Sequence, residues 1–169
     1  MRNIWVISDT HFNHDNILKF QGLDSKRFRG DIFSSTEEMN ETIIQNWNNV
    51  VKPSDIIYHL GDVFMGNKEQ FLQIAKRLNG RKRLIVGNHD DIKQIAKLNV
   101  FQKISAWRMF PEYRVLMTHV PVHPSSLQRE GHSLINVHGH THEKGSPEGP
   151  YVSACVELNN YTPVNIEDI

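Results

Sequence analysis

The sequence has little of the features that mark several specialised classes of protein. Its 169 residues include one cysteine, Cys155, which excludes an internal disulfide and favours a reducing, cytoplasmic location. The apolar run near the start covers only residues 4–7, which is too short for a signal-peptide core or a membrane span. Basic and acidic residues balance at 19 each, which argues against binding of long nucleic acid by phosphate neutralisation. We therefore expect a protein that is neither targeted nor anchored to a membrane.

The sequence also lacks any sign of division into parts. No internal repeat, low-complexity tract or linker interrupts it. A chain of this length typically forms one domain and hides roughly 70% of its unfolded surface on folding, so its core needs no disulfide. We predict a single domain over residues 1–169, in which Cys155 is a small buried hydrophobe without a function.

The apolar periodicity predicts an α/β first half and a β-rich second half. Strands are predicted over residues 3–8, 55–60, 83–86, 115–117, 134–137 and 151–156, and short helices near 13–20 and 92–98. A longer helix begins at the capping box of Ser35 and stops before Pro53. Another is capped by Asn67 and ends at Asn79. Residues 20–34 lose this periodicity and predict a long surface loop, a type that is often functional.

Histidine is unusually abundant, with ten copies, and its placement is more informative than its number. Polar clusters follow five predicted strands: Asp9 with His11, Asp62, Asn88 with His89 and Asp90, His119, and His140 with His142. In α/β sheets, ligands bind beyond the carboxyl ends of the strands, so residues far apart in sequence converge there. We therefore expect these clusters to meet at one edge of the fold.

The residue types in these clusters fit a pair of metal ions. Carboxylates and imidazoles without a thiolate suit manganese, iron, zinc, cobalt or nickel. The Asp-x-His and His-x-His spacings would place both side chains of a pair on one side of an extended chain. Glycines precede three clusters, at positions 61, 87 and 139, and are expected to permit tight turns and close approach to an anionic ligand. One such motif alone is more often a surface or packed residue, whereas five in order indicate a site.

Five short blocks in this order resemble the motifs of the calcineurin-like metallophosphoesterases. The blocks are Ser8-Asp9-Thr10-His11, Gly61-Asp62, Gly87-Asn88-His89-Asp90, Thr118-His119 and Gly139-His140-Thr141-His142. Each block alone is weakly specific, but the ordered set is highly specific and spans most of the chain. The resemblance implies an α/β fold of four layers: an αββα sandwich in which two mostly mixed β-sheets are flanked by helices, with a dinuclear centre at one edge.

The same resemblance implies a role for each residue of the site. One metal ion would be held by Asp9, His11, Asp62 and His142, and the second by Asp62, Asn88, His119 and His140. Asp62 would bridge the two ions. His89 would lie near the leaving group as a general acid or charge stabiliser, and Asp90 would orient it. The expected cofactor is a pair of divalent ions, manganese in the first place, with iron, zinc, nickel, cobalt and magnesium as alternatives.

These assignments predict a metal-dependent phosphoesterase. Paired metals acidify a shared water and stabilise charge on a phosphoryl group, so we expect in-line attack of a metal-bridging hydroxide on phosphorus. Two divalent ions would outweigh the charges of Asp9 and Asp62, and the resulting pocket would attract phosphate. Monoester and diester substrates both stay open. We expect a phosphorylated small molecule or nucleotide rather than long nucleic acid.

Several residues outside the blocks are candidate substrate contacts. They are His14, Arg27, Arg29 and His123. The two arginines and Lys26 surround Phe28, and such a group can hold a second phosphate or stack on a base, although a solvated loop is the alternative. His14 and His123 could instead be ordinary loop or turn residues. Arg129 could likewise be either a substrate contact or a solvated loop residue. His59 and His138, which precede ligands on strands, are predicted to pack beside the site rather than to bind metal.

Two functions without catalysis stand as alternatives: a protein-binding scaffold on the same fold, and a sensor that binds a phosphorylated ligand without cleaving it. Degraded ligands or a replaced His89 would favour a scaffold, whereas all the expected residues are present here. The short segments between Asn88 and His119 and after His142 leave no room for a cap domain. Specificity is therefore expected to come from loops or from a partner subunit, such as a second copy of the chain.

Overall fold

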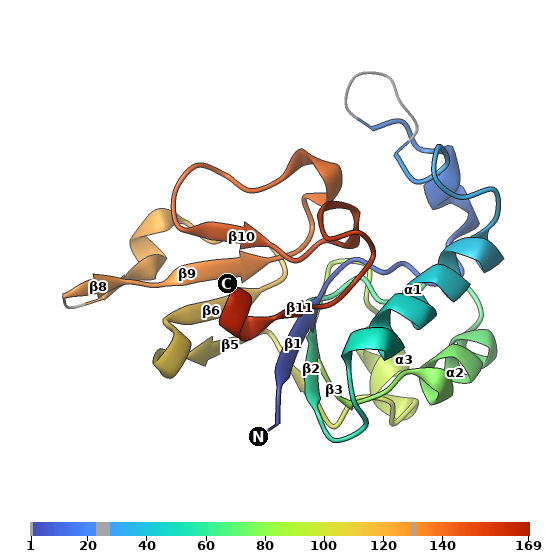
Figure 1. Cartoon of the computed structure of the whole chain (residues 1–169), viewed down its shortest axis with the longest axis horizontal. Helices are drawn as coiled ribbons and strands as arrows, with labels where there is room; N and C mark the ends of the chain where they lie inside the picture. The colour runs from blue at the N-terminus through green and yellow to red at the C-terminus, as the bar shows by residue number, and fades with distance from the viewer. Residues whose placement is uncertain (1, 23–27, 130) are drawn as a thin grey trace.

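Two β-sheets lie face to face in the computed structural model of the protein (Figure 1). The structure describes residues 2–22, 28–129 and 131–169. Lys26 and Arg27, which the sequence suggested as phosphate or base contacts, lie outside the described residues.

The first sheet contains the three strands predicted in the first half of the chain and two short strands from later in the sequence that were not predicted. Its members are β1 (Ile4–Ile7), β2 (Ile56–His59), β3 (Arg81–Ile85), β4 (Lys103–Ser105) and β11 (Val164–Asn165). They are arranged in the order β11-β1-β2-β3-β4. Strands β1 to β4 are parallel, and β11 pairs antiparallel with β1. The carboxyl ends of β1, β2 and β3 therefore share one edge of the sheet.

The second sheet contains strands from the second half of the chain. Its members are β5 (Trp107–Phe110), β6 (Val115–Thr118), β9 (Ile135–His138) and β10 (Tyr151–Ser153). Their order is β10-β9-β6-β5, with only β5 antiparallel to its neighbour. A separate hairpin joins β7 (Gln128–Arg129) and β8 (His132–Ser133). The predicted α/β fold with two mixed sheets is confirmed.

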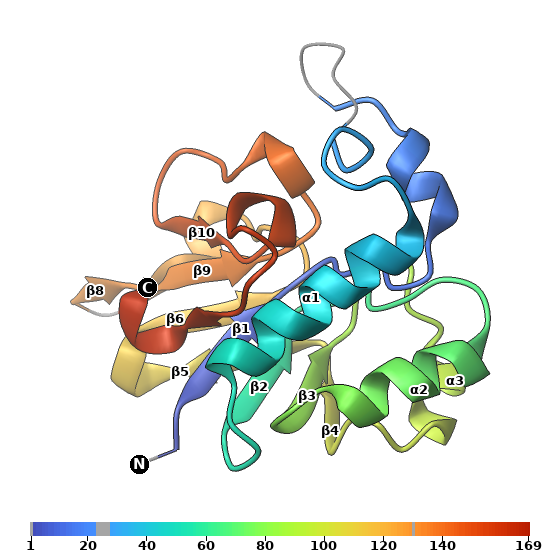
Figure 2. The same ribbon diagram turned by 45° about the vertical axis from the view of Figure 1, so that its right-hand side comes forward.

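Helices α1 (Thr36–Val50), α2 (Lys68–Arg77) and α3 (Ile92–Lys97) pack on the first sheet. Figure 2 shows α1 in front of β1 and β2, with α2 and α3 beside β3 and β4. The predicted caps are present: Ser35 Oγ accepts from the Glu38 backbone N–H, and Asn67 Oδ1 accepts from those of Glu69 and Gln70. The predicted helix near residues 13–20 is a short 3-10 helix, η1 (Asp15–Lys19). Among the described residues, each helix is too short or too polar to span a bilayer.

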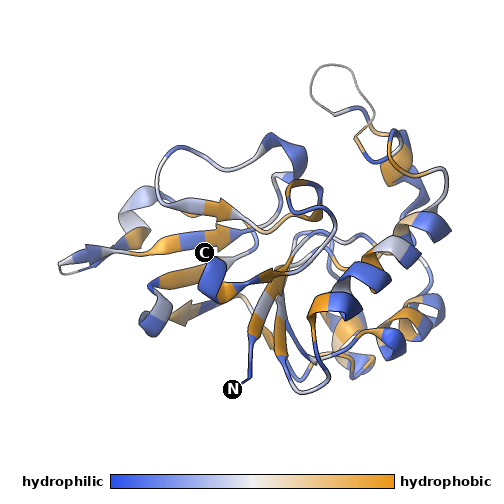
Figure 3. Ribbon diagram, viewed as in Figure 1, coloured by the Kyte–Doolittle hydropathy of each residue, from blue (hydrophilic) through white to orange (hydrophobic). Residues whose placement is uncertain are grey.

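Alternate residues of the strands face different hydrophobic cores. On β2, Ile57 packs under the helices, whereas Tyr58 packs between the two sheets. A third cluster of Leu116, Leu127 and Leu134 lies on the outer face of the second sheet. Figure 3 shows both sheets largely hydrophobic and the helices hydrophobic along one part of their surface. The sheets thus pack against each other and hold the two sets of strand ends at one side.

The family resemblance implied a layer of helices on the outer face of the second sheet, and the structure differs there. Among the described residues, this face carries the one-turn 3-10 helix η4 (Pro124–Leu127) and the β7–β8 hairpin instead of α-helices. Leu127 and Leu134 from these segments cover part of the sheet. Trp107 at the edge strand stays 57% exposed. The helical flank therefore lies on one side of the sandwich.

We expect Asp55 to contribute strongly to stability, because its buried carboxylate accepts hydrogen bonds from two backbone N–H groups and one indole. Its Oδ1 accepts from Asn3 N at 3.2 Å, and its Oδ2 accepts from Trp5 Nε1 at 3.1 Å and Lys52 N at 3.0 Å. Asp55→Ala leaves these donors without a partner and should lower the free energy of unfolding by about 2–3 kcal/mol. Urea denaturation followed by circular dichroism measures this difference.

The pH dependence of that difference provides a control. Burial favours the neutral acid, but the hydrogen bonds from Lys52 and Trp5 outweigh it and hold the pKa of Asp55 below its ordinary value. The carboxylate therefore stabilises the fold above about pH 4, and its contribution is lost as the pH falls through the lowered pKa. The difference in free energy of unfolding between wild type and Asp55→Ala should therefore become smaller below about pH 4. A gap that stays constant from neutral pH to pH 3 would contradict the assignment.

Candidate metal centre

The predicted metal ligands meet where strands of the two sheets end. Asp9 and His11 follow β1, Asp62 follows β2, Asn88 follows β3, His119 follows β6, and His140 and His142 follow β9. Because β1, β2 and β3 are parallel neighbours, and β6 and β9 are too, these positions lie at adjoining sheet edges. The structure arranges their side chains as two groups of donor atoms.

The first group consists of Asp9, His11 and His142, whose ligand atoms lie within 4.8 Å of one another. Asp9 Oδ1 is 3.9 Å from His11 Nε2 and 3.7 Å from His142 Nε2. Within the described chain, Asp9 Oδ1 and both ring nitrogens of His11 are buried without a hydrogen-bond partner. Such groups are costly to bury unless something binds them, and a cation at their centre would do so.

The second group consists of Asp62, His119 and His140, again with ligand atoms within 4.8 Å of one another. The amide oxygen of Asn88 joins it, 2.8 Å from His119 Nε2 and 2.9 Å from His140 Nδ1. His119 Nδ1 lies 2.7 Å from the Leu60 carbonyl oxygen, which can only accept a hydrogen bond. A neutral His119 therefore carries its proton on Nδ1 and presents the lone pair of Nε2 to the site. The donor set of this group fits a divalent cation.

Asp62 connects the two groups. Its carboxyl Oδ2 is 3.7 Å from His11 Nε2 in the first group and 3.5 Å from His119 Nε2 in the second. Burial, together with the nearby charge of Arg29, lowers the pKa of His11 far below its ordinary value, and burial likewise lowers the pKa of His140. Both imidazoles are therefore held neutral, which is the form that binds a metal ion.

Most of the predicted ligands have an unusual backbone conformation. Left-handed φ angles occur at Asp9 (58°), His11 (47°), Asp62 (57°), His140 (69°) and His142 (49°). Each such residue costs of order 1–3 kcal/mol unless its surroundings hold it there, and strain of this kind gathers at functional sites. The expectation that the Asp-x-His and His-x-His pairs lie on extended chain was therefore wrong. Tight turns, rather than strand alternation, bring each pair to one cavity.

Glycines make these turns possible by letting the backbone approach the two aspartates. A Cβ on Gly139 would lie 2.4 Å from Asp9 Oδ2, and one on Gly87 would lie 2.2 Å from Asp62 Oδ1. Real atoms do not approach so closely. The sequence predicted that these glycines permit tight turns and close approach to an anionic ligand. The structure shows that they make room in the turns for the carboxylates of the protein itself.

Comparison with known proteins assigns this arrangement to a family. The sequence model of the calcineurin-like phosphoesterase superfamily domain matches residues 1–154, which include both donor groups. The chain belongs to this superfamily. Its members are generally hydrolases and typically bind metal ions.

Relatives of this superfamily member cover most of its length. An uncharacterized protein of Methanocaldococcus jannaschii is 35% identical over 176 residues, covering 99% of this chain and 89% of that protein. The gene 66 protein of Mycobacterium phage L5 is 28% identical over 171 residues, covering 84% and 78% of the two chains. A crystal structure of a protein of unknown function from Aquifex aeolicus is similar with a TM-score of 0.71 and 28% identity, covering 99% and 97%. The fold is shared along almost the whole chain.

A buried ion pair supports the first donor group of this calcineurin-like domain. Glu157 Oε1 accepts from Arg29 Nε at 2.8 Å and Nη2 at 2.6 Å, and it also lies 2.8 Å from His142 Nδ1. Arg29 further donates to the backbone carbonyl oxygens of Thr10 and Asp9. Burial raises the pKa of Glu157, but the charge of Arg29 and the bond to the imidazole outweigh it, so the net shift is downward. The pair thus fixes His142 and the turn that carries Asp9.

Two sequence interpretations change as a result. Arg29 was a candidate substrate contact, but its side chain is completely buried and bound to Glu157, so that prediction was wrong. Glu157 was missed. Its only local signal is one carboxylate after the apolar residues 154–156, and its partner Arg29 lies 128 residues away in the sequence.

His89 and Asp90 occupy different environments. The ring of His89 is exposed, with its centroid 5.8 Å from that of His11, and its backbone N–H donates to Asp62 Oδ1. The Asp90 carboxylate accepts instead from the backbone N–H groups of Asp62, Val63 and Gly87. Both of its oxygens are thereby used, and burial raises its pKa. Asp90 therefore holds the turns around the second donor group, which corrects the prediction that it orients His89.

Of the other candidate histidines, only some lie beside the donor groups. His14 lies beside His11, with ring centroids 5.3 Å apart, and both line a hollow of about 460 Å³ with His89. His123 instead caps η4, because its Nδ1 accepts from the Ser125 backbone N–H. His59 is buried, with Nε2 2.9 Å from Thr10 Oγ1, and burial lowers its pKa to about 3. His14 is thus the substrate candidate that the structure leaves beside the donor groups.

Proposed function

We propose that the protein is a metal-dependent hydrolase of phosphate monoesters or diesters. The observation that carries this proposal is the pair of donor groups joined by Asp62, with buried donor atoms that have no partner in the described chain. One divalent ion would be held by Asp9, His11, Asp62 and His142, and a second by Asp62, Asn88, His119 and His140. Oxygen and nitrogen donors without thiolate suit manganese, with iron, zinc, nickel, cobalt and magnesium as alternatives.

Two bound divalent ions would supply Lewis acidity and an activated nucleophile for attack on phosphorus. The residues of the chain itself supply positioning and a proton. Glu157 and Arg29 orient His142, and Asp90 holds the turns that carry Asp62. The exposed imidazole of His89 can donate a ring proton to the departing ester oxygen. His14 lies beside the same hollow and would contact the substrate.

A small phosphorylated substrate fits the balanced charge of the chain better than long nucleic acid does, and the single reduced cysteine supports a cytoplasmic location. The scaffold and sensor alternatives predict that the donor groups bind without turnover. The exposed ring of His89 beside the first donor group supports catalysis over both, because binding alone does not require a proton donor there.

Metal removal and restoration test this proposal. We expect protein treated with a chelator to cleave neither 4-nitrophenyl phosphate nor bis(4-nitrophenyl) phosphate, and added Mn²⁺ to restore cleavage of at least one of them. Metal content, measured by plasma mass spectrometry, should approach two ions per chain in the active protein. Full metal occupancy with both esters left intact would overturn the hydrolase proposal and favour a scaffold or a sensor.

A further inference from the structure

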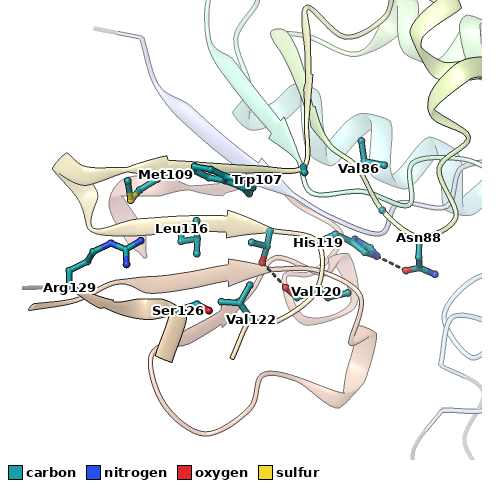
Figure 4. A pocket seen from close by; sticks show the side chains of 13 residues that line it. Val86, Asn88, Trp107, Met109, Leu116, His119, Val120, Val122, Ser126 and Arg129 are labelled. Atoms are coloured by element: carbon teal, nitrogen blue, oxygen red, sulfur yellow. Dashed lines mark hydrogen bonds between the residues drawn. The ribbon is translucent and has the colours of Figure 1, made fainter. Parts of the chain in front are cut away.

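A groove along the outer face of the second sheet opens onto the second donor group. Its volume is about 670 Å³, within the range of sites for small molecules. Asn88 and His119 form one end of the groove, and Arg129 lies at the other (Figure 4). Trp107 and Leu116 lie between these ends. A molecule held by the donor groups would therefore have this groove directly beside it.

The groove exists because no helical layer covers this part of the sheet in the described chain. Trp107 pairs with Thr118 and Met109 pairs with Leu116 across strands β5 and β6. These two cross-strand pairs form the floor of the groove and lie about 7 Å apart, the rise of two strand residues. His119, which follows β6, extends this floor toward the donor group. Trp107 is 57% exposed although it is one of the largest apolar side chains of the protein. Concave hollows with apolar walls and a few polar groups are typical sites for small molecules.

The lining of the groove indicates the chemistry of its occupant. The indole of Trp107 offers a flat surface for a planar ring, and Leu116 and Val122 add apolar contacts. The Thr118 hydroxyl donates to the Val120 carbonyl oxygen at 2.6 Å, so its proton is already used within the protein. Arg129 places a positive charge at the end far from the donor groups. This combination fits a planar apolar group with an acidic substituent on its far side.

We infer that the groove binds the organic group of the substrate: a planar, aromatic phosphoester with an acidic substituent. This inference rests on the proposed function for the position of the phosphate, which would lie at the donor groups. The groove would supply contacts that select the organic group directly beside the donor groups. A second copy of the chain is the competing occupant, but a partner surface has no need to reach Asn88 and His119 of the donor group.

Binding of a phosphonate that cannot be hydrolysed tests the groove without relying on turnover. The probe is naphthylmethylphosphonate, with and without a ring carboxylate, titrated by calorimetry into Mn²⁺-loaded protein. We expect Trp107→Ala to weaken binding of both probes by about tenfold, the usual effect of removing a stacking partner. Arg129→Gln should weaken only the carboxylated probe. The matched controls Ile32→Ala, an exposed apolar residue elsewhere, and Arg81→Gln should bind both probes like wild type.

Rates of ester cleavage, compared with probe binding, distinguish failure of this inference from failure of the proposed function. With active protein, Trp107→Ala should lower the preference for naphthyl phosphate over glycerol phosphate by about tenfold, mainly through KM. Probe binding that depends on Trp107, without turnover of any ester, would support the groove and overturn the hydrolase. Turnover with probe binding that is indifferent to Trp107 and Arg129 would overturn the groove and leave the hydrolase standing. A change from dimer to monomer in Trp107→Ala, with probe binding unchanged, would assign the face to a second copy and overturn the inference.

Discussion

Replacing Asp62 by alanine is expected to abolish paired metal binding and to lower turnover by more than about 10³-fold, or roughly 4 kcal/mol of transition-state stabilisation. Asp62 is buried, and its Oδ2 is the atom within 3.7 Å of His11 Nε2 and 3.5 Å of His119 Nε2. Its removal takes a negative charge from between the two donor groups. Metal content and the rate of phosphoester cleavage, measured on the same preparations, report the two effects.

His89→Ala provides the contrast, because its ring belongs to neither donor group. We expect this variant to keep its metal content and to lose about 10²- to 10⁴-fold in rate, the usual contribution of a general acid. Asp91→Ala is the matched control for removal of a nearby aspartate. Asp91 caps α3 by accepting from the Gln94 backbone N–H, so its loss should cost about 1 kcal/mol of stability and no metal. Equal metal loss in the His89 and Asp62 variants would refute the division of roles.

Glu157→Ala should produce the largest loss of stability among the variants considered. It leaves the buried Arg29 without its carboxylate partner, and removal of one partner of a buried ion pair typically costs about 3–5 kcal/mol. It also removes the acceptor for His142 Nδ1. Affinity for metal at the first donor group should therefore fall by about 10- to 100-fold. Thermal unfolding and competition with a chromophoric chelator measure these effects.

Two comparisons show whether Glu157 acts through position rather than through stability alone. Glu157→Gln keeps an oxygen acceptor and should recover part of the metal affinity, whereas general loss of structure would not respond to this change. Glu41→Gln is the matched control, because Glu41 and Arg77 form an exposed ion pair that contributes only about 0–1 kcal/mol. Metal affinity in Glu157→Ala equal to that of wild type would show that the ion pair does not position His142.

Several features of this fold follow from short stretches of sequence. The capping interactions of Ser35 and Asn67 connect residues at most three positions apart, so local residue types determine where α1 and α2 begin. The apolar runs that form β1 and most of β2, and the apolar end of β3, are visible in the same way. Strands β4, β5 and β11 were not predicted, because short edge strands such as Lys103–Ser105 carry little periodicity and form through pairing with distant neighbours.

The amino-acid sequence by itself determined which residues carry the candidate chemistry, because each ligand type and its place after a strand is a local property. Only the tertiary structure decided how they are held. The turn glycines beside Asp9 and Asp62, the backbone partners of Asp90 and the Arg29–Glu157 pair all depend on contacts between segments far apart in the chain. The groove beside Trp107 is likewise a tertiary property, because it arises from how little of the sheet the rest of the described chain covers. No local pattern of residues encodes such an uncovered surface.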